Sequence, residues 1–66
     1  MTTEQMLELA CGNVEAHLGD VVDEEATTDA IFDEAYTLAF DALHDAGVEQ
    51  KIARKIAADV AQSFAQ

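Results

Sequence analysis

This chain of 66 residues contains no proline, no tryptophan, one cysteine and only three Lys and Arg residues. Because Cys11 is the single cysteine, an internal disulfide is excluded, and no Cys and His residues have the spacing of a structural zinc site. A domain of this length buries only about 60% of the surface of its unfolded chain, so its stability is marginal. Oligomerisation is the remaining aid for such small domains, and we therefore predict a homodimer.

Long apolar runs are also missing. The longest ones fall far short of the roughly 20 residues of a membrane-spanning helix. The first residues, MTTEQMLEL, lack the basic and apolar regions of a signal peptide. An acidic surface is in addition repelled by anionic lipid. We therefore expect a cytoplasmic protein with no membrane partner.

Helical periodicity is present in three segments. Apolar residues recur three and four positions apart in residues 3–18, 28–46 and 49–65, and no segment alternates with the period of a strand. This pattern predicts an all-α fold, a small three-helix bundle that forms a single domain over residues 1–66. Thirteen alanines and few large apolar residues favour closely packed helices around a thin core.

Threonines and a glycine mark the expected helix ends. Thr2 or Thr3 can cap the first helix, and Thr27 or Thr28 can cap the second. Gly47 is expected to end the second helix, because glycine adopts the left-handed conformation that commonly follows a helix.

Two features weaken the helical pattern. Gly12 lies inside the first helix, where glycine costs about 1 kcal/mol relative to alanine unless another helix approaches closely there. Residues 20–27 read DVVDEEAT and are expected to form an acidic connector, in which Val21 and Val22 cover the end of the core.

Charge is distributed unevenly along the chain. The net charge is −11, and the first fifty residues hold thirteen of the fourteen Asp and Glu residues and no Lys or Arg. Many of these acids recur four or eight residues apart in the expected helices, where side chains four apart lie about 5–6 Å from each other. The predicted acidic face consists of Glu4, Glu8, Glu15, Asp29, Asp33, Glu34, Asp41 and Asp45.

We interpret this acidic face as a docking surface for a basic surface of another protein. A field of one sign raises association rates and makes affinity fall with salt. B-DNA carries about one negative charge per 1.7 Å of its axis, so rows of carboxylates can imitate its backbone. The most specific form of the hypothesis is therefore an inhibitor that acts as a nucleic-acid mimic on a nucleic-acid-binding protein.

A second interpretation remains open. The chain can be a structural or adaptor module that associates through apolar helix faces, as a homodimer or with a partner helix. In that case Tyr36 and Phe40, four residues apart in the second helix, are the interface candidates. The acidic surface then serves solubility or adaptation to high salt.

The three cations, Lys51, Arg54 and Lys55, are close together near the start of the third expected helix. Positive charge at a helix N-terminus opposes the helix dipole, so local helix energetics do not explain these residues. The spacing places them on one face, away from the apolar row that contains Ile52 and Ile56. We predict that they form ion pairs, within the chain or across a dimer interface, and that they do not bind nucleic acid directly.

Motifs for catalysis and metal binding are lacking. No Ser or Thr has a His at a recognisable spacing, so we expect no enzyme activity and no cofactor. Asp41 and His44 form one Asp-x-x-His pair, whereas a dimetal bundle uses two Glu-x-x-His pairs, and no metal site is predicted. Cys11 has no cation nearby in sequence to lower its pKa, and we expect it to be a small core residue.

Overall fold

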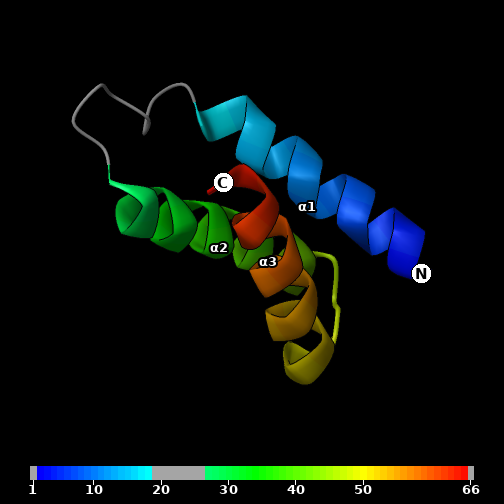
Figure 1. Cartoon of the computed structure of the whole chain (residues 1–66). Coiled ribbons are helices and arrows are strands. Elements are labelled where there is room, and N and C mark those ends of the chain that lie inside the picture. The colour runs from blue at the N-terminus through cyan, green and yellow to red at the C-terminus, as the bar shows by residue number, and fades with distance from the viewer. Residues whose placement is uncertain (1, 19–26, 66) are drawn as a thin grey trace.

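The computed structural model describes residues 2–18 and 27–65. These ranges contain three helices, α1 (Thr3–Leu18), α2 (Thr28–Asp45) and α3 (Gln50–Phe64), and no strand (Figure 1). The predicted all-helical architecture of three helices is therefore confirmed, and each helix begins and ends within one residue of its expected bounds. The homodimer stays a prediction. Most of the expected acidic connector, with Val21 and Val22, lies outside the described residues.

Reciprocal hydrogen bonds at Thr2 start α1. The Gln5 backbone N–H donates to Thr2 Oγ1 at 3.1 Å, and the Thr2 backbone N–H donates to Gln5 Oε1 at 2.9 Å. This arrangement is a capping box, which satisfies two backbone donors that a helix end leaves free. At α2, the Ala30 N–H donates to Thr27 Oγ1 at 3.1 Å, so Thr2 and Thr27 are the capping residues among the expected threonines.

A glycine ends α2 as the sequence predicts. Gly47 has a φ of +82°, the left-handed region that favours glycine. Its N–H donates to the carbonyl of His44 at 3.0 Å, and the Val48 N–H donates to the carbonyl of Leu43 at 3.0 Å. These two bonds form a Schellman motif, which satisfies carbonyls at the helix end and turns the chain toward α3.

The core is thin and consists largely of alanine. Among the described residues, six of the eleven buried ones are alanines, and Leu43, Val14 and Val60 are the largest fully buried side chains. Small side chains bring helix axes close together, so the bundle relies on close packing and not on bulky residues. The buried residues are Met6, Ala10 and Val14 from α1, Ala35, Ala39 and Leu43 from α2, and Ala53, Ile56, Ala57, Val60 and Ala61 from α3.

Helix α2 packs against both other helices, whereas α1 and α3 touch over a shorter stretch. In Figure 1, α1 passes near the C-terminal end of α3, and the N-terminal halves of these two helices diverge. None of the helices in the described ranges has the length and apolar character that crossing a membrane requires.

Candidate partner-binding surfaces

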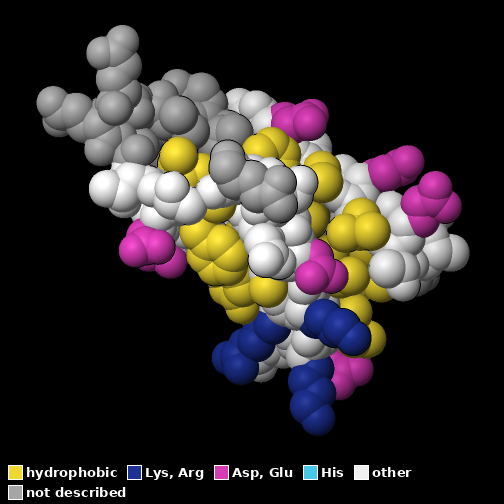
Figure 2. All heavy atoms as spheres, in the orientation of Figure 1, with side chains coloured by type: hydrophobic (Ala, Val, Ile, Leu, Met, Phe, Trp, Pro, Cys, Tyr) yellow, Lys and Arg dark blue, Asp and Glu magenta, His cyan; other side chains and the backbone are white. Residues whose placement is uncertain are grey.

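All eight residues of the predicted acidic face are exposed. Within residues 2–18 and 27–65, their carboxylates take no part in the side-chain hydrogen bonds of the fold. Figure 2 shows the acidic side chains spread over the visible face, while Lys and Arg gather at one end of the molecule. The carboxylates are therefore available to a partner in solution.

The acidic residues of α2 form a row that winds around the helix. Each step of four residues in an α-helix turns about 40° beyond a full turn, because one turn takes 3.6 residues. Asp29, at the start of the row, borders a hollow between α2 and α3, whereas Asp45, at its end, borders a groove between α1 and α2. The acidic face is therefore a band across the surface, and its two ends meet different helices.

The groove between α1 and α2 brings acidic residues of two helices together. Glu8 of α1 and Asp45 of α2 both border it, and Leu9 is 39% exposed within it. Its volume is about 510 Å³, and its other lining residues are Gly12, Asn13, Ala16 and Ala42. The groove thus combines an exposed leucine with small side chains and two carboxylates.

Two observations explain the shape of this groove. The Asn13 side-chain amide donates to the carbonyl of Leu38 at 2.7 Å, which ties α1 to α2 beside the groove. A Cβ built on Gly12 would have no neighbour within 4 Å, so no helix approaches this glycine closely. Of the two alternatives for Gly12, a weak point in the helix or a close approach of another helix, the structure excludes the second, and the glycine leaves the floor of the groove open.

Leu9 is the residue that the sequence analysis missed. It lies outside the apolar row formed by Met6, Ala10 and Val14, which is buried in the core. Its position in the sequence was the available signal for a binding surface. A leucine outside the apolar row of its helix must be exposed to solvent or must contact another surface.

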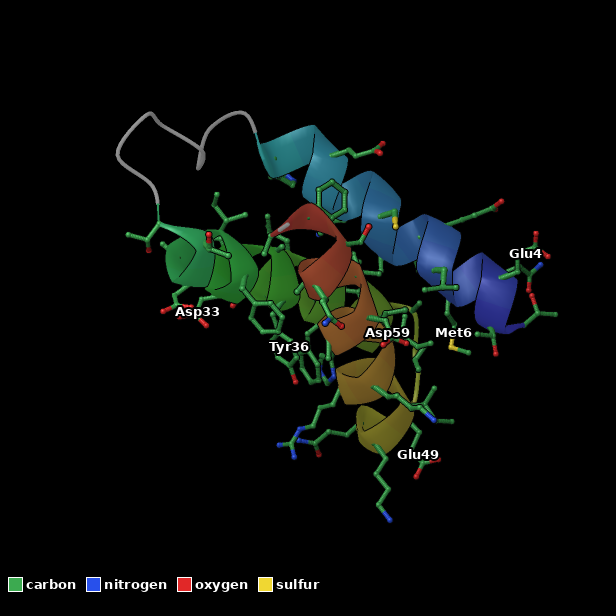
Figure 3. All side chains as sticks on the ribbon, in the orientation of Figure 1. Glu4, Met6, Asp33, Tyr36, Glu49 and Asp59 are labelled. Carbon is green, nitrogen blue, oxygen red and sulfur yellow. The ribbon has the colours of Figure 1, made fainter. Side chains whose placement is uncertain are left out.

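The aromatic residues of α2 stack along one row. Ring centroids are 6.3 Å apart from Phe32 to Tyr36, 6.3 Å from Tyr36 to Phe40, and 6.1 Å from Phe40 to His44. The row lies between the exposed acidic row and the buried row that contains Leu43. Tyr36, which projects from α2 in Figure 3, and Phe40 are half-buried and pack against the core. Both therefore stabilise the single chain, and their role in an interface stays a prediction.

The three cations do not share one environment. Lys51 and Lys55 line a second groove, between α1 and α3, together with Ile52 and Ile56. Lysine stems can reach past apolar neighbours, so a groove shared with Ile52 and Ile56 does not contradict the expected separate face of the cations, which stays a prediction. Arg54 is exposed and does not line the groove.

This second groove has a volume of about 590 Å³. Ile52 is 43% exposed in it, and Thr3, Met6 and Asp59 complete its lining. In Figure 3, Met6 projects from α1 and Asp59 from α3 into the space between the two helices. The ion pairs predicted for Lys51, Arg54 and Lys55 stay a prediction.

No group of three or more His, Cys, Asp and Glu residues within the described ranges is arranged to hold a metal ion. His44 is exposed and stacks on Phe40.

Cys11 is half-buried and packs against the core. Burial raises the pKa of its thiol, and the nearby carboxylate of Glu15 raises it further. A thiol of this kind is mostly protonated at neutral pH and is a weak nucleophile. The environment of Cys11 is therefore the opposite of a catalytic cysteine site.

Alkylation should test this environment. We expect Cys11 to react slowly with iodoacetamide at neutral pH and to reach half of its maximal rate above the pH of about 8.5 that is typical of a free cysteine. Glu15→Gln should lower that midpoint, because it removes the Coulombic contribution and keeps the burial. The urea-unfolded chain is the control, and a midpoint in the folded chain below that of the control would contradict the assignment.

No match to this chain was found among protein families, curated proteins or solved structures.

Proposed function

We propose that this chain binds a basic segment of another protein through the groove between α1 and α2 and the carboxylates around it, together called the acidic groove. The observation that carries the proposal is the meeting of Glu8, Asp45 and the exposed Leu9 in one groove. Protein–protein interfaces typically combine a small apolar anchor with a polar rim. Leu9 supplies the apolar anchor, and the two carboxylates supply the polar rim.

The groove favours a particular kind of partner. An amphipathic basic helix can place an apolar side chain against Leu9, Ala16 and Ala42, which line the groove. Its Lys and Arg residues then face Glu8 and Asp45 across the rim. The net charge of −11 would steer such a partner toward the chain and speed its association at low salt.

A nucleic-acid-binding protein is the partner class that fits this charge most specifically. Such proteins carry basic surfaces that match the phosphate backbone. The exposed carboxylates of α1 and α2 offer rows of negative charge to such a basic surface, so the chain would act as an inhibitor by occupying it. In this form the protein works by binding and not by catalysis.

The structural or adaptor module is the second candidate function. The observation that favours it is the aromatic row, in which Phe32, Tyr36 and Phe40 are only half-buried in the single chain. A partner helix or a second copy would cover the rest of these rings. Binding of this kind should persist in high salt, whereas binding to the acidic groove should weaken steeply.

A labelled amphipathic peptide of leucine and arginine is a suitable probe for the acidic groove, measured by fluorescence anisotropy. We expect Leu9→Ser to weaken binding at least about tenfold, since an exposed apolar anchor contributes about 1–2 kcal/mol or more. The double variant Glu8→Gln with Asp45→Asn should weaken it by a similar factor at low salt. Circular dichroism would check that each variant keeps its helices.

Matched controls separate the groove from general charge attraction. Glu49→Gln with Asp59→Asn changes the net charge equally but lies outside the predicted acidic face, and Ile52→Ser removes the other exposed apolar side chain. Both should leave peptide binding nearly unchanged. Equal losses of peptide affinity in the two acidic double variants would mean that only net charge matters. Peptide binding that is unaffected by Leu9→Ser would overturn the groove as the binding site.

A further inference from the structure

The groove between α1 and α3 differs in character from the acidic groove. It holds Lys51 and Lys55, two of the three cations of the chain, at the edge of an apolar floor formed by Met6, Ile52 and Ile56. Figure 2 shows this region, where hydrophobic side chains lie beside Lys and Arg in a molecule that is otherwise rich in acid. Its occupant should therefore carry apolar surface together with carboxylates.

We infer that this groove is a homodimer interface, in which α3 packs antiparallel to α3 of a second copy about a two-fold axis. The inference goes beyond the proposed function, because it concerns the groove between α1 and α3 and assigns it to a second copy of the chain. The charged residues of α3 itself support this inference. Two chains of net charge −11 repel each other, and complementary local charges at an interface offset this repulsion.

The exposed row of α3 is complementary to its own antiparallel copy. Lys51, Lys55 and Asp59 follow each other at steps of four residues and all line the groove. When two such rows run antiparallel about an axis that crosses the row midway between Lys55 and Asp59, Lys55 of each copy faces Asp59 of the other. A two-fold interface repeats every contact, so one arrangement yields two such pairs.

The apolar part of the groove supports the same arrangement. Ile52, 43% exposed, occupies the row next to the charged one and lies one turn before the buried Ile56. A second copy on the groove would cover Ile52 and the exposed edge of Met6. Burial of apolar surface then supplies the free energy of association, while the pairs between Lys55 and Asp59 set the register.

Complementary charge reversal tests the inference. By sedimentation velocity from micromolar to millimolar concentration, the wild-type chain should form dimers. Lys55→Glu and Asp59→Lys should each raise the dimer dissociation constant at least about tenfold, because each places like charges opposite each other. An equimolar mixture of the two variants should recover dimers, since Glu at position 55 then meets Lys at position 59 in one pair and the unchanged Lys55 meets Asp59 in the other.

Two controls make the test specific. Arg54→Glu imposes the same charge change as Lys55→Glu on α3 but outside the groove, and it should leave dimerisation nearly unchanged. Ile52→Ser should abolish dimers, whereas Leu9→Ser should keep them. A wild-type chain that stays monomeric at millimolar concentration overturns the inference, and so does a mixture that fails to recover dimers.

The outcomes are independent of the proposed function. Loss of peptide binding in Leu9→Ser with intact dimers would support the acidic groove alone. A monomeric wild type that binds the peptide would refute only the dimer. If the groove instead accepts an acidic amphipathic peptide or a fatty acid while the chain stays monomeric, the second copy is ruled out as its occupant.

Discussion

Leu43→Ala is expected to lower the free energy of unfolding by about 2–5 kcal/mol, the range for leucine truncation in a protein core. Leu43 is the largest fully buried side chain within residues 2–18 and 27–65, with 0% exposure. Its buried neighbours in α2, Ala35 and Ala39, have only methyl side chains, so they cannot fill the space that it leaves. Small domains lie toward the low end of the usual stability of about 5–15 kcal/mol, so this variant should be largely unfolded or close to it.

Urea titration followed by far-UV circular dichroism measures this loss. Leu38→Ala is the matched control, because Leu38 lies in the same helix and is only partly buried. The control should lose clearly less stability than Leu43→Ala. Equal losses, or a loss below about 1 kcal/mol for Leu43→Ala, would mean that the core does not centre on Leu43.

Gly47→Ala is expected to lower the free energy of unfolding by about 1–2 kcal/mol, the cost of the left-handed conformation for a residue with a Cβ. Gly47 has a φ of +82°, and a Cβ there would meet nothing within 4 Å, so the whole cost comes from the backbone. The substitution strains the motif in which the N–H groups of Gly47 and Val48 bond the last turn of α2. Thermal or urea unfolding measures the change.

Gly12→Ala is the control, and it should change the free energy of unfolding in the opposite direction. Gly12 is helical and exposed, its φ is not positive, and a Cβ would again meet nothing within 4 Å. Alanine should therefore raise stability by up to about 1 kcal/mol through its higher helix propensity. Two identical substitutions thus give opposite results because one backbone position is left-handed and the other is helical. A stabilising Gly47→Ala would contradict the left-handed turn.

The helices could be predicted because their signals are local. Thr2 with Gln5 and Thr27 with Ala30 form hydrogen bonds across a single turn, so a short stretch of sequence specifies where α1 and α2 begin. Gly47 specifies the end of α2 in the same way. The threonine that caps each helix was left open between two neighbours, and only the backbone conformation decides between them.

The acidic face was predicted residue by residue but its shape was not. Exposure of each carboxylate follows from the helical period, which places polar residues opposite the apolar row. That Glu8 and Asp45 border one groove, while Asp29 borders another, depends on where α1 and α3 lie against α2. The period of one helix carries no information about its neighbours, so these acids could be predicted only as a single surface.

The amino-acid sequence alone determined that this protein is helical, that its core is thin and rich in alanine, and that nearly all of its acid precedes its three cations. These properties follow from residue types and from interactions within a few positions. Only the tertiary structure decided that Leu9 belongs to an acidic groove and Ile52 to a basic one. Each groove is formed by two helices far apart in the chain, and its lining depends on how alanine-rich surfaces pack, which no local pattern encodes.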